Sequence, residues 1–292
     1  MELPDSWIEV LDNHKIGRKE ASEILGIAEE DVRAFRRILK IENKPKGHIQ
    51  GKGIALWDIH YPEHDKPCIN IVYDFTEDLQ PDYFILGGDQ LDMSCISIYN
   101  KGKPKLLENK RLKRDYQNFQ KNILDRFESV LPDKCKKIFM IGNHEYRVTR
   151  LIESDPQYEG FIEVENNLDL SDWEIIPYNG IYSIGYMNFI HGYYTNKYHS
   201  SKTLSVYGDN IFYGHTHNHQ AFTSTTKIEN LPKIGMGVGC LCNKNPDWMH
   251  NKPNSWVHEF LHFTVFSDGT FSPHINRIIN GRCEINGKVY VG

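Results

Sequence analysis

The sequence of 292 residues has no long apolar run, few cysteines and no excess of positive charge. No apolar run is long enough to cross a bilayer, and the first residues lack a basic segment followed by an apolar one. We therefore expect neither membrane insertion nor secretion. A formal net charge of -5 argues against a protein that coats nucleic acid by bulk charge, although a local basic patch is still compatible with it.

Six cysteines without C-x-x-C spacing are sparse for a chain of this length. We therefore expect reduced thiols and a cytoplasmic protein. Cys240 and Cys242 would share one face of a strand. They could form half of a metal site there, but two small buried residues are the favoured interpretation.

Residues 1–48 differ from the rest of the chain by their helical pattern. Apolar residues recur at helical spacing on both sides of Gly26, as in two short amphipathic helices joined at a glycine. The pair resembles a helix-turn-helix unit. Its second helix would expose Arg33, Arg36, Arg37 and Lys40. A helical hairpin packed on a neighbouring domain fits the same pattern, so DNA binding is one of two alternatives.

Residues 43–53 contain the proline and glycines of a linker, and we predict that a second, larger domain spans residues 53–292. In it, apolar segments that end in polar residues alternate with helical stretches at 66–79 and 108–130. The segments are "GIALWDIH" (53–60), "DYFILGGD" (82–89), "KIFMIGNH" (137–144), "YMNFIHG" (186–192) and "NIFYGHTH" (210–217). This alternation predicts an α/β core, with reactive residues at the carboxyl ends of strands. Asp268-Gly269 and Asn286-Gly287 predict two hairpins of a β-rich C-terminal part.

Each of the five strand ends carries residues that can ligate a metal ion. Asp58 and His60 are two residues apart, as are His215 and His217, so each pair would share one face of an extended segment. The other three ends carry Asp89, Asn143 with His144, and His191. A lone buried histidine is usually a hydrogen-bonded core residue, but five such ends in one chain indicate a metal centre.

These motifs resemble the calcineurin-like metallophosphoesterases, whose pattern is D-x-H, G-D-x-x-D, G-N-H-E, H and G-H-x-H. Here they read "DIH" (58–60), "GDQLD" (88–92), "GNHE" (142–145), "HG" (191–192) and "GHTH" (214–217). The resemblance implies a mixed α/β and α+β fold, a four-layer αββα sandwich. "DIHYPEHDKP", "HGYYTNKYHS" and "GCLCNKNPDW" resemble a branch of phage and bacterial proteins that is grouped loosely with DNA-repair nucleases. A phage-encoded member would act in the host cytoplasm.

The resemblance also implies two divalent metal ions. Two cations supply a hydroxide at neutral pH and positive charge on both sides of the displaced phosphate. Mixed carboxylate, imidazole and amide ligands suit manganese, or iron or zinc, better than calcium. The implied ligands of one metal are Asp58, His60, Asp89 and His217, and those of the other are Asp89, Asn143, His191 and His215, with Asp89 as the bridge.

The implied general acid is His144, which would protonate the leaving oxygen while Asp92 orients its imidazole. Met93 stands where protein Ser/Thr phosphatases have an arginine, so a protein phosphatase is disfavoured. Three residues could contact phosphate or stack on a base, or could equally belong to a surface salt bridge and an aromatic loop. They are Arg147, Lys197 and His199. We expect His64 and His219 to lie near the metals or at the surface, without ligating a metal.

We predict a two-metal phosphodiesterase that acts on nucleic acid, DNA or RNA, or on nucleotides. Bases outnumber acids between residues 101 and 137, which fits either a phosphate-binding patch or a solvated helix face. The acidic segment 153–174 is expected to be surface. The alternatives are a phosphatase or phosphodiesterase for a small phosphorylated metabolite or nucleotide, and a non-catalytic nucleic-acid-binding protein with a structural metal pair. Nuclease relatives are often dimers, so a homodimer is a further expectation.

Overall fold

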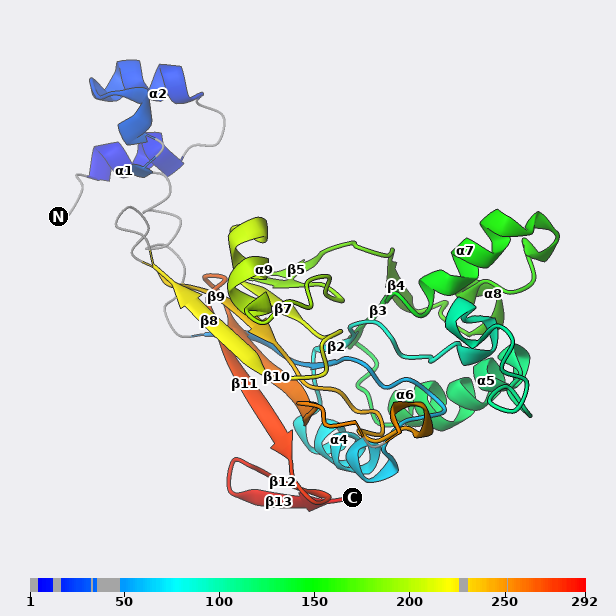
Figure 1. Ribbon diagram of the computed structural model, residues 1–292. Coiled ribbons are helices and arrows are strands. Elements are labelled where there is room, and N and C mark those ends of the chain that lie inside the picture. Colours follow the sequence, from blue (N-terminus) through cyan, green and yellow to red (C-terminus); the bar gives the residue numbers. More distant parts are fainter. Residues whose placement is uncertain (1–4, 13–16, 33, 36–47, 226–230, 251) are drawn as a thin grey trace.

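The computed structural model describes residues 5–12, 17–32, 34–35, 48–225, 231–250 and 252–292. Two β-sheets and their helices form its main part (Figure 1). The helices are α1 (Asp5–Asp12), α2 (Arg18–Leu25), α4 (Lys66–Leu79), α5 (Leu112–Phe119), α6 (Asp125–Glu128), α7 (Tyr146–Ser154), α8 (Val164–Asn167) and α9 (His199–Tyr207). Short turns are η1 (Ser94–Ile96), η2 (Ile98–Asn100), η3 (Gln120–Leu124), η4 (Pro156–Tyr158) and η5 (Asp247–Met249).

The first sheet has six strands in the order β11-β10-β1-β2-β3-β4. Its strands are β1 (Ile49–Leu56), β2 (Tyr83–Leu86), β3 (Lys136–Met140), β4 (Trp173–Ile176), β10 (His258–Phe266) and β11 (Phe271–Ile278). Strands β1 to β4 are parallel, whereas β10 runs antiparallel to β1 and to β11. The carboxyl ends of β1, β2 and β3 therefore meet at one edge of this sheet.

The second sheet has five strands in the order β5-β6-β7-β9-β8. They are β5 (Tyr182–Ile184), β6 (Met187–Phe189), β7 (Ile211–Tyr213), β8 (Gln220–Ser224) and β9 (Lys233–Gly237), and β6, β7 and β9 are parallel. A separate hairpin, β12 (Arg282–Ile285) and β13 (Lys288–Val291), packs beside α4. The predicted turns at Asp268-Gly269 and Asn286-Gly287 connect β10 to β11 and β12 to β13, as expected.

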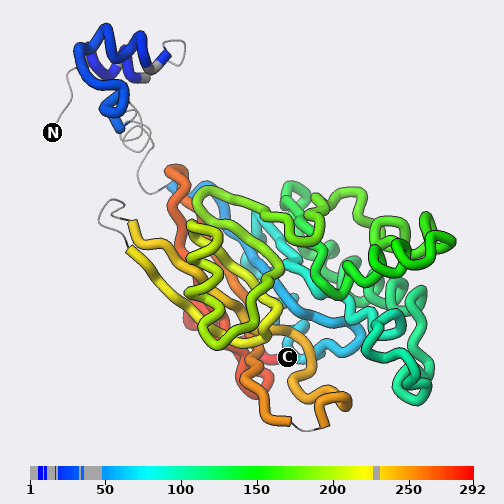
Figure 2. Tube along the Cα trace, turned by 45° about the horizontal axis from the view of Figure 1, so that its top comes forward, coloured from blue at the N-terminus to red at the C-terminus, as the bar shows by residue number. Residues whose placement is uncertain are grey.

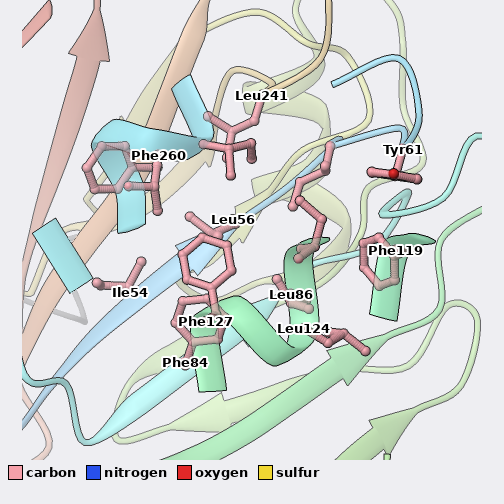
Figure 3. Close-up of a cluster of buried hydrophobic side chains, with 14 of the residues drawn as sticks. Ile54, Leu56, Tyr61, Phe84, Leu86, Phe119, Leu124, Phe127, Leu241 and Phe260 are labelled. Atoms are coloured by element: carbon pink, nitrogen blue, oxygen red, sulfur yellow. The ribbon is translucent and has the colours of Figure 1, made fainter. Parts of the chain in front are cut away.

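The two faces of the first sheet bury different cores. Ile54 and Leu56 of β1 point into a cluster shared with α4, α5 and α6, which Figure 3 shows with Phe84, Phe127 and Phe260. The alternate residue, Ala55, and Trp57 after the strand point into a second cluster with residues of the other sheet, among them Phe189 and Phe212. This alternation is the period of two of a β-strand, and here both faces are apolar because both are covered.

Helix α9 covers the far face of the second sheet, against β7, β8 and β9. The layers are therefore helices α4 to α6, the first sheet, the second sheet and α9. The predicted four-layer αββα sandwich is confirmed. The predicted helix 66–79 coincides with α4, whereas the predicted helix 108–130 is α5 and α6 separated by the π-helical turn η3.

The N-terminal helices have a small core of their own. Leu11 of α1, Ala21 of α2 and Val32 are buried together, and residues 29–32 and 34–35 are helical. Gly26 ends α2 in the left-handed conformation that glycine favours, at the junction predicted from the sequence. The proposed DNA-contacting residues Arg33, Arg36, Arg37 and Lys40 lie outside the described residues. The domain boundary at residue 48 and the helix-turn-helix interpretation remain predictions.

The six cysteines are free, and five of them, including Cys240 and Cys242, are buried. Within the described parts of the chain, no helix combines the length and apolarity needed to cross a bilayer.

Candidate metal centre

The predicted ligands meet at one end of the sandwich, beyond the carboxyl ends of parallel strands in both sheets. The first sheet contributes the residues after β1, β2 and β3, and the second sheet contributes those after β6 and β7. Five predicted ligands have a left-handed backbone with φ between 49° and 68°: Asp58, His60, Asp89, His215 and His217. Non-glycine residues rarely adopt this conformation, and it concentrates at functional sites.

Two glycines of the motifs make room for carboxylates. A Cβ atom on Gly142 would lie 2.2 Å from Oδ1 of Asp89, and one on Gly214 would lie 2.4 Å from Oδ2 of Asp58. Any side chain at these positions would displace a predicted ligand. The glycines of "GNHE" and "GHTH" are therefore explained by close approach of the backbone to the site.

Asp58, His60 and His217 form the first ligand group. The Nε2 atoms of the two histidines face each other at 3.1 Å and lie 3.7 Å and 3.3 Å from Oδ1 of Asp58. This Oδ1 atom is buried and finds no hydrogen-bond donor among the described residues. On the other side of the His217 ring, Nδ1 lies 3.8 Å from Sγ of Cys242, which leaves Nε2 directed at Asp58. Sγ of Cys242 and one ring nitrogen each of His60 and His217 lie within 4.8 Å of one another.

Asp89, Asn143 and His191 form the second group. His191 Nε2 lies 2.9 Å from Oδ1 of Asn143 and 3.4 Å from Oδ2 of Asp89. One ligand atom each of Asp89, His191 and His215 lie within 4.8 Å of one another. Nδ1 of His191 lies 3.2 Å from the carbonyl oxygen of Gly87, to which it can donate its proton. In that tautomer Nε2 is unprotonated, so three acceptor atoms converge without a hydrogen between them.

Both groups fit divalent cations. Buried acceptors that face one another are unfavourable unless a proton or a cation lies among them. Burial disfavours a charged His191, but the Asp89 carboxylate beside it raises the pKa of His191 to about 9, so without a metal a proton on Nε2 takes the place that a cation would fill. The carboxylate, imidazole and amide donors are those of the transition-metal sites predicted from the sequence. The residues present therefore match two metal ions, with Asp89 in reach of both groups because its Oδ2 is also 3.8 Å from Nε2 of His60.

Glu145 supports this arrangement, although the sequence analysis assigned it no role. Its buried carboxylate accepts hydrogen bonds from the backbone N–H groups of Asp89, Leu91 and Gly142 at 2.8 to 3.0 Å. Glu145 thereby ties the loop after β2 to the loop after β3. The only signal in the sequence was its place as the last residue of "GNHE".

His144 and Asp92 lie together at the edge of the centre. Nδ1 of His144 is 2.8 Å from the backbone oxygen of Asp92 and 3.4 Å from its carboxylate, which also lies 3.5 Å from His60. Arg147 donates to the same backbone oxygen at 2.6 Å, and its Nη2 lies 2.9 Å from Nε2 of His144. Burial alone would raise the pKa of Asp92, but His144 and His60 lower it below its usual range.

The ligands line a cleft of about 170 Å³. Its lining residues are His60, Glu63, Asp89, Asp92, Asn143, His144, His215, His217, Cys242, Asn243, Pro246, Trp248 and Trp256. The last five belong to the chain between β9 and β10, which Figure 2 shows in orange as an excursion from the two sheets. The sequence analysis assigned no role to Trp248 or Trp256.

The structure places two predicted substrate contacts away from the cleft lining. His199 is buried, and its two ring nitrogens lie 2.6 Å from the hydroxyl of Tyr213 and 2.9 Å from Asn218 Oδ1, so it anchors α9 to the second sheet. Lys197 is exposed and lies over the Tyr198 ring. Arg147, by contrast, reaches the site.

His64 and His219, expected to lie near the metals or at the surface without ligating a metal, contact other groups. His64 stacks on Tyr61 with ring centroids 4.8 Å apart. His219 pairs with the buried carboxylate of Glu259 at 3.1 Å.

Basic residues surround the cleft unevenly. Lys110 pairs at 3.0 Å with Glu63, a residue of the cleft wall. Tyr61 and His64, which alternate in sequence with the cleft residues His60 and Glu63, line a separate cavity of about 460 Å³. Its other lining residues are Lys66, Ile69, Asn70, Lys121, Asn122, Ile123 and Arg126. The lining contains three cations and no carboxylate. Lys121 and Arg126 belong to the basic segment predicted from the sequence.

No family model matches the chain. The chain is similar to the Gene 54 protein of Mycobacterium phage L5, with 24% identity over 254 residues that cover 81% of this chain and 97% of the phage protein. The Gene 54 protein of Mycobacterium phage D29 has 23% identity with the same coverage. The predicted relationship to phage proteins is confirmed, and the link to DNA repair remains a prediction.

Solved structures similar to this fold include Vps29. Vps29 of Entamoeba histolytica complexed with Zn+2 has a TM-score of 0.43 and 10% identity, over 80% of this chain and 96% of that chain. Vacuolar Protein Sorting 29 of Cryptosporidium parvum has a TM-score of 0.40 and 11% identity, over 83% and 99%. The function is therefore argued from the site itself.

Proposed function

We propose that this protein is a two-metal phosphoesterase that hydrolyses phosphodiester bonds of nucleic acid or nucleotides. The observation that carries the proposal is the convergence of buried acceptors: Nε2 of His191, Oδ1 of Asn143 and Oδ2 of Asp89 in one group, beside the unpaired Oδ1 of Asp58 in the other. Because these buried atoms are acceptors, the site is suited to bind cations. It is also open to substrate through the cleft that its residues line.

Two divalent ions, manganese in the first instance, would supply an acidified water and positive charge facing the phosphate oxygens. The chain contributes the remaining functions. Asp89 holds the two ligand groups together, and its Oδ1 fixes the backbone N–H of His144 at 2.8 Å. His144 lines the cleft. Once Arg147 has moved off Nε2 and this nitrogen has taken up a proton from solvent, His144 can pass that proton to the leaving oxygen.

Arg147 is suited to bind the phosphate. Its guanidinium makes hydrogen bonds to a carbonyl and an imidazole but no ion pair with any described carboxylate. An approaching phosphate would offer it charged, bidentate acceptors in their place. Binding of substrate would then free His144 for proton transfer, so that substrate binding and proton transfer are coupled.

Two features support a nucleic-acid strand or a nucleotide as substrate. The separate cavity lined by Tyr61 and His64 offers Lys66, Lys121 and Arg126 to a further phosphate, and two aromatic rings line the cleft. A long polyanion would contact both cavities, whereas a small metabolite would occupy only the cleft. We place this activity in the host cytoplasm, because the relatives are phage proteins.

The test is hydrolysis by the purified protein with Mn²⁺, of bis-p-nitrophenyl phosphate, p-nitrophenyl phosphate and single- and double-stranded DNA. We expect turnover of the diester and of DNA, and loss of both activity and bound metal in Asp89→Asn. Asp133→Asn is the matched control because Asp133 is exposed and outside the cleft. Monoester turnover with intact DNA would replace the proposal by a small-molecule phosphatase. Two bound metals with no hydrolysis would favour a non-catalytic protein.

A further inference from the structure

The wall of the metal cleft contains two tryptophans, of which Trp256 is partly buried and Trp248 is exposed. Both belong to the chain between β9 and β10, Trp248 in the short turn η5 and Trp256 just before β10. Trp248 is 56% exposed, so much of its indole faces solvent at the cleft. Trp248 is not a lone surface residue, because it shares the cleft wall with Trp256 and the predicted ligands, where two indoles offer a planar apolar surface to a bound molecule.

The two indole rings and the His217 ring form a series of contacts between the surface and the predicted metal ligands. Trp248 and Trp256 have ring centroids 6.1 Å apart at 59°, and Trp256 contacts the ring of His217 with centroids 4.2 Å apart at 65°. His217 in turn faces Asp58 in the first ligand group. A molecule that touches Trp248 therefore lies in the same cleft as a phosphate bound at the metal ligands.

The position of Trp256 is fixed by hydrogen bonds of its own loop. Its backbone N–H donates to Oδ1 of Asn254 at 2.9 Å, and the next N–H, of Val257, donates to the carbonyl of His217 at 2.9 Å. The side-chain amide of Asn254 donates to the carbonyl of Lys244 at 2.9 Å, which closes the loop. The ring of Trp256 is thus held in place beside His217 before any substrate binds.

We propose that Trp248 and Trp256 form a base-stacking subsite, which holds the nucleobase of the nucleotide whose phosphate lies at the metal ligands. The inference rests on the proposed phosphoesterase function and extends it to the substrate class. A nucleotide carries a planar aromatic base close to its phosphate, which matches indole rings close to metal ligands. Stacking on an indole tolerates any base, so the subsite would distinguish nucleotides from other phosphodiesters without reading sequence.

The test compares thymidine 5′-p-nitrophenyl phosphate with methyl p-nitrophenyl phosphate, which carries the same leaving group and no base. Trp248→Ala should raise KM about 10-fold for the thymidine ester and leave KM for the methyl ester unchanged, as expected for one lost stacking partner. Trp248→Phe should restore most of the affinity. Phe161→Ala is the control, because Phe161 is 74% exposed and outside the cleft lining.

A second readout does not depend on turnover. Thymidine monophosphate should quench the tryptophan fluorescence of the whole protein, and Trp248→Phe should lose most of this quenching. Equal changes in KM for both esters would overturn the subsite, as would unchanged KM for both. If wild-type protein hydrolyses neither ester, the phosphoesterase proposal fails, while quenching that depends on Trp248 still supports base binding. Absence of that quenching overturns the subsite by itself.

Discussion

Nη2 of Arg147 lies 2.9 Å from Nε2 of His144, the nitrogen that would have to carry the proton for the leaving group. Because a guanidinium can only donate, Nε2 is an acceptor in this arrangement, and Nδ1 can donate to the backbone oxygen of Asp92. Nε2 of His144 is therefore not free to meet a leaving group until Arg147 turns away. We expect the substrate phosphate to displace Arg147 from this position, because it offers the guanidinium charged acceptors.

Substitution of Arg147 should therefore affect substrate binding and turnover together. Arg147→Ala is expected to lower kcat/KM for a phosphodiester about 100-fold, because a charge-assisted bidentate contact is lost. Arg147→Lys should recover only part of this, since an ammonium cannot make the same paired contact. Arg150→Ala is the control on the same helix, where Arg150 lies over the Tyr146 ring. Wild-type kinetics in Arg147→Ala would refute a role for this residue.

His144→Asn should reveal general-acid catalysis through its dependence on the leaving group. A poor leaving group such as a sugar hydroxyl needs the proton, so cleavage of a dinucleotide should fall about 1,000-fold. Release of p-nitrophenolate needs it far less, so bis-p-nitrophenyl phosphate hydrolysis should fall about 10-fold or less. Bound metal is measured in parallel and should not change. The same loss on both substrates would show that His144 does not act as the acid.

Glu145→Gln should loosen the metal centre without replacing a metal ligand. The amide replaces one acceptor oxygen by a donor, so one of the three buried N–H groups of Asp89, Leu91 and Gly142 loses its partner. The cost is expected to be about 1–3 kcal/mol of unfolding free energy, with weaker Mn²⁺ binding. Urea denaturation and metal analysis measure both effects. Glu153→Gln, at an exposed position of α7, should change neither.

His262 should make stability depend on pH. Burial and the neighbouring His274 lower the pKa of His262 to about 4, and both amide atoms of Asn276 lie within 3.1 Å of its Nδ1. In the unfolded chain the pKa is about 6.5, so the unfolded state binds more protons between pH 4 and 6.5. The contribution of neutral His262 to the free energy of unfolding is therefore fully present above pH 6.5 and is lost as the pH falls towards 4.

Between pH 7 and 5 this contribution should amount to roughly 2 kcal/mol. Urea denaturation at the two pH values should show that the wild-type protein loses about that much more stability than His262→Gln. His250→Gln, at an exposed position, should behave like the wild type. An identical loss in wild type and His262→Gln would contradict the assignment.

The sequence was sufficient to predict the position of residues that directly follow strands, because the order of the strands decides which of these residues meet. The polar residues after the strands were predicted to meet, and the structure brings Asp58, His60 and His217 together as expected. The prediction that each H-x-H or D-x-H pair lies on an extended segment was wrong, because β1 ends at Leu56, β7 ends at Tyr213 and these residues have a left-handed backbone. Helix α4 was predicted to the residue because its apolar period is regular. The π-helical turn η3 was not, since one extra residue in a turn leaves little trace in the pattern of apolar residues.

Contacts made by irregular loops could not be predicted. Trp248 and Trp256 reach the cleft only through the path of the chain between β9 and β10, which has no periodic signal. His199 was grouped with substrate contacts because it follows a loop of aromatic residues, but it is the first residue of α9 and its ring is buried. Arg147 meets His144 because one turn of helix separates them, yet only the side-chain rotamers decide that contact.

The most direct test of the two-metal account is a titration of chelator-treated protein with Mn²⁺, in which bound metal and hydrolysis of bis-p-nitrophenyl phosphate are measured on the same samples. The account predicts that activity rises to a plateau when two Mn²⁺ ions are bound per chain, and that Asp89→Asn reaches neither. Full activity with one ion, or two bound ions with no hydrolysis, would contradict it.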